Sequence, residues 1–349
     1  MFDDSIFNRI ILQNHLSLRK DFHPKVIGIK INKNLYFSIN SDIHRDINKR
    51  IVNYILSDIP VNSSACAYIK GKSYLDFLSP HCKNCYFLRL DIKNFFHSFP
   101  ERILDEFLLS LFNNEKPKGS DELSSYELAR LVLLYKCDDE YSDDSIKGRS
   151  ILPIGFPSSP IISNILFRKI DILIEKYCYT RGITYTRYAD DMLFSSKSSG
   201  FLLKSEFERE MSFLISLLGF RLNNNKTIRS SNELSLNGYV IYNYMENNRS
   251  GIRLSNKKLS IIRKVIYYKK NKMSNDFIMR RLFNIHINNF KFKYGKHESF
   301  FEKYCEDQIQ HKIRGFRSFL LSFSNYSKEN YGVCEEYIEL VNELEKYII

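Results

Sequence analysis

The chain has 349 residues, of which 44% are hydrophobic and 14% aromatic, so it carries enough apolar side-chain area to exclude a disordered protein. Its formal net charge of +12 favours a polyanionic partner such as nucleic acid. No run of about 18 apolar residues occurs and the N-terminus is acidic, so we expect neither a membrane-spanning helix nor a signal peptide.

The first 60 residues predict helices interrupted by short strands. Apolar residues at every fourth position from Ile43 to Ile55 predict a helix, whereas residues 26–29 and 35–37 predict strands. The apolar run 86–91, which ends at Asp91, predicts a further strand.

Cysteine usage indicates reduced thiols. The chain has seven cysteines, an odd number, which is typical of a cytoplasmic protein. Cys82 and Cys85 flank two residues and follow His81, but no second pair completes a four-ligand zinc site. The sequence therefore favours reduced thiols over a metal site at this position.

The middle of the chain predicts helices at 101–112, 122–136 and 160–180, with an acidic loop at 138–144 between the last two. Pro160 falls in the first turn of its helix, where the missing N–H costs nothing.

Two runs rich in β-forming residues follow, 183–188 and 192–196, and they predict a hairpin with Asp190 and Asp191 near its tip. A helix is expected at 204–218, ended by Gly219, and a strand at 236–242.

From residue 255 onward the sequence predicts a mainly helical, basic region. Residues 249–317 contain 18 Lys and Arg against five Asp and Glu, interleaved with aromatic residues. Cationic groups displace counterions from phosphate backbones and rings stack on bases, so this region, including Lys269, Lys270 and Lys272, is expected to bind nucleic acid. A solvated helix face is the alternative interpretation.

Three acidic residues form the candidate catalytic group: Asp91 at a strand end, and Asp190 with Asp191 at a hairpin tip. Phosphoryl transfer from a nucleotide uses two Mg²⁺ ions, which prefer carboxylate oxygens. Carboxylates from neighbouring strands of one sheet can meet around such a pair. Each acidic position alone is equally compatible with ordinary turn or strand-end chemistry.

Five segments, in order along the chain, resemble motifs A to E of reverse transcriptases. They are Leu88-Arg89-Leu90-Asp91-Ile92-Lys93-Asn94-Phe95-Phe96, Leu152-Pro153-Ile154-Gly155 with its continuation to Asn164, Tyr188-Ala189-Asp190-Asp191, Leu218-Gly219-Phe220 with its continuation to Thr227, and Leu236-Asn237-Gly238-Tyr239-Val240. Ile69-Lys70-Gly71-Lys72-Ser73, His81 and Lys312-Ile313-Arg314-Gly315-Phe316 extend the resemblance to the bacterial retron-type branch.

The resemblance implies an α+β right-hand polymerase. Fingers are expected at 1–85 with an insertion at 113–150, a palm of antiparallel sheet plus helices at 86–245, and a basic helical thumb at 246–349.

The resemblance also implies roles for single residues. Asp91, Asp190 and Asp191 would be catalytic and hold two Mg²⁺ ions, for which Mn²⁺ could substitute, with the Ile92 carbonyl as a further ligand. Phe96 would exclude a 2′-hydroxyl, and the other residues expected to bind the nucleotide are Lys70, Lys72, Gly155 and Lys226. Arg314 would join the three thumb lysines in binding nucleic acid.

Three departures from the family pattern occur: Ile154 stands where motif B commonly has Gln, Phe77 and Leu78 replace an Asn-Ala pair, and Leu236-Asn237-Gly238 replaces Val-Thr-Gly. They favour a divergent retron or a related defence-associated enzyme.

The function expected from the resemblance is RNA-directed DNA synthesis on a dedicated noncoding RNA, in anti-phage defence. Its partners would be that RNA, dNTPs and the DNA product, without a membrane, and an effector protein or a second copy of the chain stays open. The alternatives are a template-independent or protein-primed DNA synthase, an inactive RNA-binding scaffold, and an RNA-dependent RNA polymerase, which Phe96 disfavours.

Overall fold

The computed structural model describes residues 3–31, 34–116, 121–138, 146–198, 200–244, 249–290, 298–330 and 335–348. The chain divides into two compact units, one of residues 1–234 with 241–252 and one of residues 235–240 with 253–349. The predicted division into fingers, palm and thumb is finer than this and stays a prediction.

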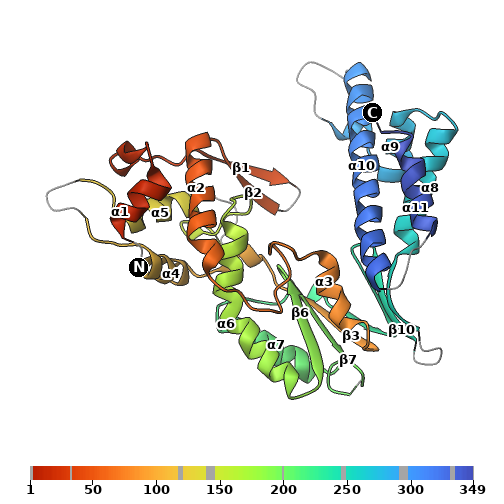
Figure 1. Ribbon diagram of the computed structural model, residues 1–349, viewed down its shortest axis with the longest axis horizontal. Coiled ribbons are helices and arrows are strands. Elements are labelled where there is room, and N and C mark those ends of the chain that lie inside the picture. Colours follow the sequence, from red (N-terminus) through yellow and green to blue (C-terminus); the bar gives the residue numbers. More distant parts are fainter. Residues whose placement is uncertain are drawn as a thin grey trace. The chain divides into compact units, whose positions relative to one another are not determined.

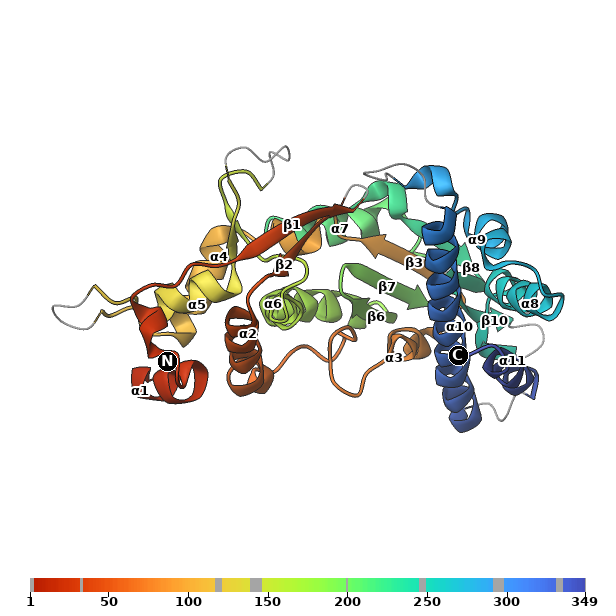
Figure 2. The same ribbon diagram turned by 90° about the horizontal axis from the view of Figure 1, so that it is seen from above.

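The helices and strands of the first unit are drawn in Figures 1 and 2. Its helices are α1 (Asp4–Ile6), α2 (Asp42–Tyr54), α3 (Tyr74–Leu78), α4 (Glu101–Leu111), α5 (Ser125–Leu133), α6 (Ser159–Tyr179) and α7 (Ser205–Ser216), with short helical turns η1 (Phe7–Leu12), η2 (Leu16–Arg19), η3 (Leu56–Asp58), η4 (Ser79–His81), η5 (Phe95–Ser98) and η6 (Asn224–Lys226). Its strands are β1 (Val26–Ile31), β2 (Asn34–Ile39), β3 (Tyr86–Asp91), β4 (Tyr135–Lys136), β5 (Ser150–Ile151), β6 (Ile183–Tyr188), β7 (Asp191–Ser196) and β8 (Ile228–Ser231).

A four-stranded antiparallel sheet of order β6-β7-β3-β8 is the centre of this unit, and Figure 2 shows β3, β6 and β7 side by side. Side chains alternate between the faces of a strand, so Leu88 and Leu90 of β3 point to the same face as Met192 and Phe194 of β7. That face is buried in one apolar core with residues of α6 and α7. The opposite face is therefore the one that carries Asp91 and Asp191.

The second unit is mainly helical, as the sequence predicts. It contains α8 (Asn256–Lys270), α9 (Asn275–Phe283), η8 (Ile287–Asn289), α10 (Glu298–Asn330) and α11 (Glu335–Glu345). The boundary between the units crosses a three-stranded sheet of β9 (Glu233–Leu236), β10 (Tyr239–Tyr244) and β11 (Arg249–Leu254), with β10 in the middle.

Most predicted elements are confirmed, and several differ. The single strand expected at 236–242 is wrong, because Asn237 and Gly238 both have positive φ and turn the chain between β9 and β10. The sequence does not predict the strands β4, β5, β8, β9 and β11, and the helix expected at 122–136 is shorter, because β4 occupies its last two residues. Of the acidic loop predicted at 138–144, all but Asp138 lies outside the described residues.

The predicted reduced thiols agree with the structure, in which Cys82 and Cys85 are buried and form no disulfide. His81 is fully buried, and its two ring nitrogens lie 2.6 Å from Ser195 Oγ and 2.8 Å from Thr186 Oγ1. This histidine therefore ties η4 to β7 and β6. None of the helices within the described ranges is long and apolar enough to cross a membrane.

Candidate active site

The three candidate aspartates converge at one end of the sheet. Asp91 ends β3 and pairs in register with Asp191, which begins the neighbouring strand β7. Asp190 lies in the turn between β6 and β7, and its carbonyl accepts a hydrogen bond of 3.0 Å from the Ile92 N–H. Ala189 adopts a left-handed φ of 56° in that turn, so the chain reverses tightly and Asp190 and Asp191 come directly after the end of β6. Residues 99 positions apart in the sequence are thus adjacent in space.

Arg89 joins two of these carboxylates. It points to the same face of β3 as Asp91, two residues away, and one of its guanidinium nitrogens donates to Asp91 Oδ2 at 3.3 Å and also to Asp191 Oδ1. The other terminal nitrogen donates to the Lys226 carbonyl at 3.0 Å. Because a single nitrogen reaches both carboxylates, Asp91 and Asp191 are close enough to share one metal ion or a pair of ions.

Two residues of the predicted motif D also reach Asp91. Lys226 Nζ lies 3.1 Å from Asp91 Oδ2, and Asn223 Nδ2 donates to Asp91 Oδ1 at 3.0 Å. The Asn223 N–H donates to the Asp91 carbonyl at 2.8 Å. The structure therefore places Lys226 beside Asp91, and its predicted contact with the leaving pyrophosphate stays a prediction. Asn223 and Arg89, which the sequence interpretation missed, also contact the aspartates.

Two of the three acids, Asp190 and Asp191, have a raised pKa. Burial raises the pKa of Asp191 to about 6, and the charges of Asp190 and Asp91 act in the same direction, while Arg89 opposes them. Burial and the charge of Asp91 likewise raise the pKa of Asp190. Such a cluster of negative charges is stabilised by a divalent cation.

The carboxylates of Asp91, Asp190 and Asp191 are suited to a hard metal ion, although Asp91 and Asp191 are paired with neighbouring cationic side chains. Among the described residues, no three Asp, Glu, His or Cys side chains are grouped closely enough to enclose an ion. Asp91 and Asp191 contact Arg89, and Asp91 also contacts Lys226. The carboxylate oxygens are nevertheless the ligands that Mg²⁺ prefers, and they lie at adjacent strand ends.

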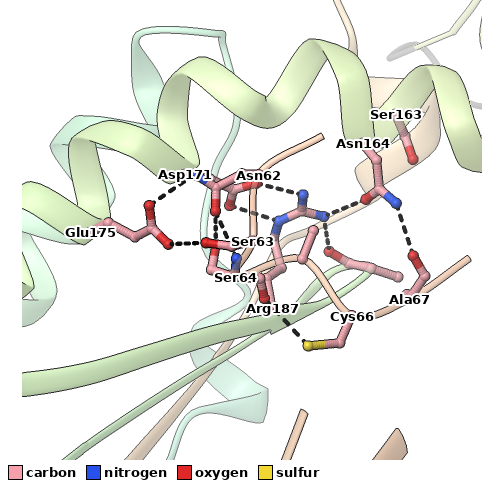
Figure 3. A network of polar contacts seen from close by, with 12 residues as sticks. Asn62, Ser63, Ser64, Cys66, Ala67, Ser163, Asn164, Asp171, Glu175 and Arg187 are labelled. Carbon is pink, nitrogen blue, oxygen red and sulfur yellow. Dashed lines mark hydrogen bonds and ion pairs between the residues drawn. The ribbon is translucent and has the colours of Figure 1, made fainter. Parts of the chain in front are cut away.

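A buried ion pair fixes the backbone that carries Asp190 and Asp191 (Figure 3). Arg187 of β6 and Asp171 of α6 are both fully buried, and they form two hydrogen bonds of 2.9 and 2.7 Å. The same guanidinium donates to the Ala189 carbonyl at 3.0 Å and to Asn164 Oδ1 at 3.2 Å. The ion pair thus connects α6 to the turn between the two strands.

The segment 62–67 is held by the same group of residues. Backbone bonds of 2.8 Å run from the Arg187 N–H to the Ser64 carbonyl and from the Cys66 N–H to the Arg187 carbonyl. Asn164 Nδ2 donates to the Ala67 carbonyl at 2.8 Å, and Figure 3 shows these contacts around Arg187.

Phe96 lies five residues after Asp91 in the sequence and packs on the surface of the apolar core. The centroid of its half-buried ring lies 5.4 Å from the ring centroid of Phe95 and 6.2 Å from that of Tyr68. This partial exposure is compatible with the predicted contact to a nucleotide sugar.

Gly155 has a structural reason for being glycine that differs from the predicted one. Its φ is +115°, and a Cβ there would collide with the backbone carbonyl of Phe37 in β2. The Phe37 N–H donates to the Ile154 carbonyl at 2.8 Å. The close approach that Gly155 allows is therefore to the β1–β2 hairpin, and its contact to a nucleotide stays a prediction.

The two lysines expected to bind the triphosphate differ in their surroundings. Lys72 Nζ donates to the Ser63 and Ala65 carbonyls, both at 2.8 Å, so it holds the segment 62–67. Lys70 is exposed. Triphosphate binding by both lysines stays a prediction, and Lys70 is the freer of the two.

The four predicted nucleic-acid contacts of the second unit lie on α8, in the turn after it and on α10. Lys269 and Lys270 end α8, and Lys272 follows in the turn. Lys269 Nζ donates to Asn275 Oδ1 at 2.9 Å, and burial lowers its pKa, whereas Lys270 and Lys272 are exposed. Arg314 is exposed on α10.

Residues 8–241 match the model of the family described as reverse transcriptase (RNA-dependent DNA polymerase). The chain belongs to the reverse transcriptase family. Membership gives it the right-hand polymerase fold and RNA-directed DNA synthesis as its class of reaction, and the family in general uses divalent metal ions.

Similar proteins place it in the retron-type branch. The chain is 30% identical over 231 residues to the retron Ec83 reverse transcriptase of Escherichia coli, an alignment that covers 66% of this chain and 70% of that protein. With the retron Ec73 reverse transcriptase of the same organism it shares 30% identity, over 43% of this chain and 45% of that one. A telomerase from Candida albicans, solved in complex with a TWJ fragment of telomeric RNA, aligns at 11% identity and a TM-score of 0.42, over 95% of this chain and 64% of its own.

Proposed function

We propose that this retron-type reverse transcriptase copies a dedicated noncoding RNA into DNA with two Mg²⁺ ions held by Asp91, Asp190 and Asp191. The observation that carries the proposal is the cross-strand pairing of Asp91 with Asp191 and their contact with one Arg89 nitrogen. The Ile92 carbonyl would add a further ligand, and Mn²⁺ would substitute for Mg²⁺. Two similar proteins are named retron reverse transcriptases, and we infer from this resemblance a retron RNA as template and a role in anti-phage defence.

The reaction joins the 3′-oxygen of a primer to the α-phosphorus of a dNTP. The new P–O bond forms as the bond from that phosphorus to the α,β-bridging oxygen breaks, pyrophosphate leaves with the electron pair, and the 3′-hydroxyl proton passes to solvent. Bound Mg²⁺ would stabilise the charge that develops on the entering and leaving oxygens.

Residues of this chain supply the remaining groups. Lys226, now 3.1 Å from Asp91, would turn its ammonium to the leaving pyrophosphate once metal ions neutralise the carboxylates. Phe96 would fill the space below the sugar and select dNTPs. Lys70 would contact the triphosphate, with a smaller part for Lys72.

The test uses the protein with the RNA that co-purifies with it. Supplied with Mg²⁺ and labelled dNTPs, this complex should make DNA, and treatment with RNase beforehand should prevent synthesis. Sequencing the product and the RNA should show that one is complementary to the other.

Other results identify the alternatives. Equal synthesis after RNase treatment would support a template-independent enzyme, and label that stays with the protein after denaturation and nuclease digestion would support protein priming. RNA binding without synthesis under any metal or nucleotide condition would support a scaffold.

A further inference from the structure

A cavity of about 630 Å³ lies in the first unit, between the last turns of α6 and the start of β6. Its lining is formed by Cys178, Tyr179, Ile183 and Tyr185, together with Glu175, Lys176 and Thr180. The five steps from the first to the last residue of β6 span about 17 Å, and Asp190 follows the far end of that strand. The cavity is therefore separate from the candidate active site.

The strand β6 forms one edge of the four-stranded sheet, whose order is β6-β7-β3-β8. In an antiparallel pair, the backbone groups of every second residue point to the partner strand and those of the residues between them point away. The N–H and carbonyl of Arg187 point away from β7, since they bond to Ser64 and Cys66. Tyr185 and Ile183 lie two and four residues before Arg187, so their backbone groups point to the same outer edge.

The segment 64–66 covers only one end of this edge, where Ala65 pairs with Arg187 in a parallel bridge. In the part of the chain that the structure describes, residues 183–185 form no bridge and no backbone hydrogen bond on their outer side. A row of such N–H and carbonyl groups is a template for a further extended chain. Every second side chain of an added strand would face the cavity, because Ile183 and Tyr185 both line it.

Lys176 supplies the charge that this cavity offers to a ligand. Glu175 accepts hydrogen bonds from Asn62 Nδ2 at 2.9 Å and from Ser63 Oγ at 3.3 Å, so both of its carboxylate oxygens are occupied, as Figure 3 shows. The Lys176 side chain is exposed and, within the described ranges, forms no ion pair. An acidic group therefore complements the cavity, and the ring of Tyr179, which is 86% exposed, adds apolar surface at its rim.

We propose that this edge groove, formed by the cavity and the outer edge of residues 183–185, docks an extended peptide segment of a partner protein. The peptide adds as a strand beside β6, its apolar side chains at alternate positions enter the cavity, and an acidic side chain pairs with Lys176. In this mode of recognition the main chain provides affinity and the pockets provide specificity. The site goes beyond DNA synthesis, because nucleotidyl transfer at the aspartates makes no use of it.

Peptide selection tests the groove directly. A phage-displayed library of random nonapeptides is selected on the full chain with its co-purifying RNA, and we expect the enriched sequences to alternate apolar residues and to contain an acid. Synthetic peptides of these sequences should bind the groove variant Lys176→Glu with Tyr179→Asp at least about tenfold more weakly, because like charges then face one another. The matched control, Lys204→Glu with Phe213→Asp, makes the same changes at exposed residues outside the groove and should bind as the original chain does.

Hydrogen exchange at single amides locates the bound peptide. Exchange at Ile183 and Tyr185 should slow at least about tenfold, since each amide gains an acceptor. Thr184 is the internal control, because its N–H points to β7 and its exchange should not depend on the peptide. Both variants should keep RNA-dependent DNA synthesis, which shows that the fold is intact.

Three results would overturn the proposal. A selection without enrichment, or enriched peptides that bind the groove variant as tightly as the original chain, would remove the docking site. Exchange that slows elsewhere and is unchanged at Ile183 and Tyr185 would place the peptide on another surface. Self-association of the original chain that the groove variant abolishes would assign the groove to a second copy of the chain.

Discussion

Arg89, Asn223 and Lys226 show how much of a site depends on strand register. The sequence predicts the three aspartates and Lys226, because each falls in a recognisable motif. It does not predict Arg89 or Asn223, because their contacts to Asp91 and Asp191 arise from pairing between segments more than 100 residues apart. The only local signal for Arg89 is its spacing of two from Asp91, which places both on one face of a strand.

Phe96 is the residue on which we propose that sugar selection depends. Replacing it with Ala removes the ring and opens space for a 2′-hydroxyl, so kcat/KM for ribonucleotides relative to dNTPs should rise about tenfold or more. Single-nucleotide incorporation with each substrate measures this ratio. Phe213→Ala, at an exposed ring of α7, is the control. An unchanged ratio would leave Phe96 as a core residue only.

His81 gives the fold a defined dependence on pH. Burial lowers its pKa to about 3 from an ordinary value of 6.5, so the unfolded chain binds the extra proton between these values and the folded chain does not. Stability contributed by the neutral ring is full above pH 6.5 and is lost as pH falls, by about 2 kcal/mol at pH 5.

Chemical denaturation between pH 7 and pH 5 measures this slope. We expect His81→Asn to be less stable at pH 7 but to show a flatter slope, whereas His23→Gln, at an exposed histidine, should leave the slope unaltered. A slope that His81→Asn does not change would mean that other groups cause the acid sensitivity.

At the scale of elements, one buried ion pair links α6, β6 and the turn that carries two aspartates. Arg187 points to the same face of the sheet as its cross-strand partner Met192, which is buried in the apolar core. Asp171 follows Ile170 on α6, and both residues are buried. An acid within the apolar face of a helix is a sequence signal for such a partner, but the sequence does not say which cation it meets. Packing of α6 on the sheet decides that.

Removing one member of this pair should be costly, because it leaves a buried charge without its partner. We expect Asp171→Asn to lower the free energy of unfolding by about 3–5 kcal/mol. Asp42→Asn, at an exposed ion pair, should change it by less than about 1 kcal/mol. Equal unfolding free energies in the two variants would contradict the stabilising part given to the buried pair.

The double variant Asp171→Leu with Arg187→Met separates stability from positioning. It should recover most of the lost stability, since no buried charge remains, but lose DNA synthesis, since the Ala189 carbonyl loses its donor. Full synthesis in this double variant would show that the bond to Ala189 does not position the aspartates.

The elements that the sequence predicts well are those with a buried face. The apolar strands β3, β6 and β7 and the amphipathic helices α2, α4 and α6 are evident in the sequence. The strand β8 is short and mainly exposed, so its Arg-Ser-Ser sequence carries no strand pattern. The Asn237-Gly238 pair was a hairpin signal that the single-strand prediction at 236–242 overlooked.

At the scale of the whole chain, the two units differ in the charge of their sequences. The basic stretch 249–317 falls almost entirely in the second unit, which contains α8 to α11. Of the predicted contacts, Lys270, Lys272 and Arg314 are exposed, whereas Lys269 is engaged with Asn275.

Charge reversal tests this unit as an RNA-binding surface. Lys270→Glu with Lys272→Glu should weaken RNA affinity, and the slope of log K against log[salt] should flatten by roughly 0.7–0.9 for each phosphate that the protein no longer neutralises. The control is Lys169→Glu with Lys204→Glu in the first unit. Equal slopes in both variants would return the basic region to a solvated helix face.

DNA synthesis by the variant Asp190→Asn with Asp191→Asn tests whether acids distant in the chain form one metal-dependent catalytic centre. We expect a loss of at least about a thousandfold, with the co-purifying RNA still bound and the fold intact, while Asp42→Asn keeps full synthesis. RNA-dependent synthesis at the original rate in the double variant would contradict the assignment of these aspartates to catalysis.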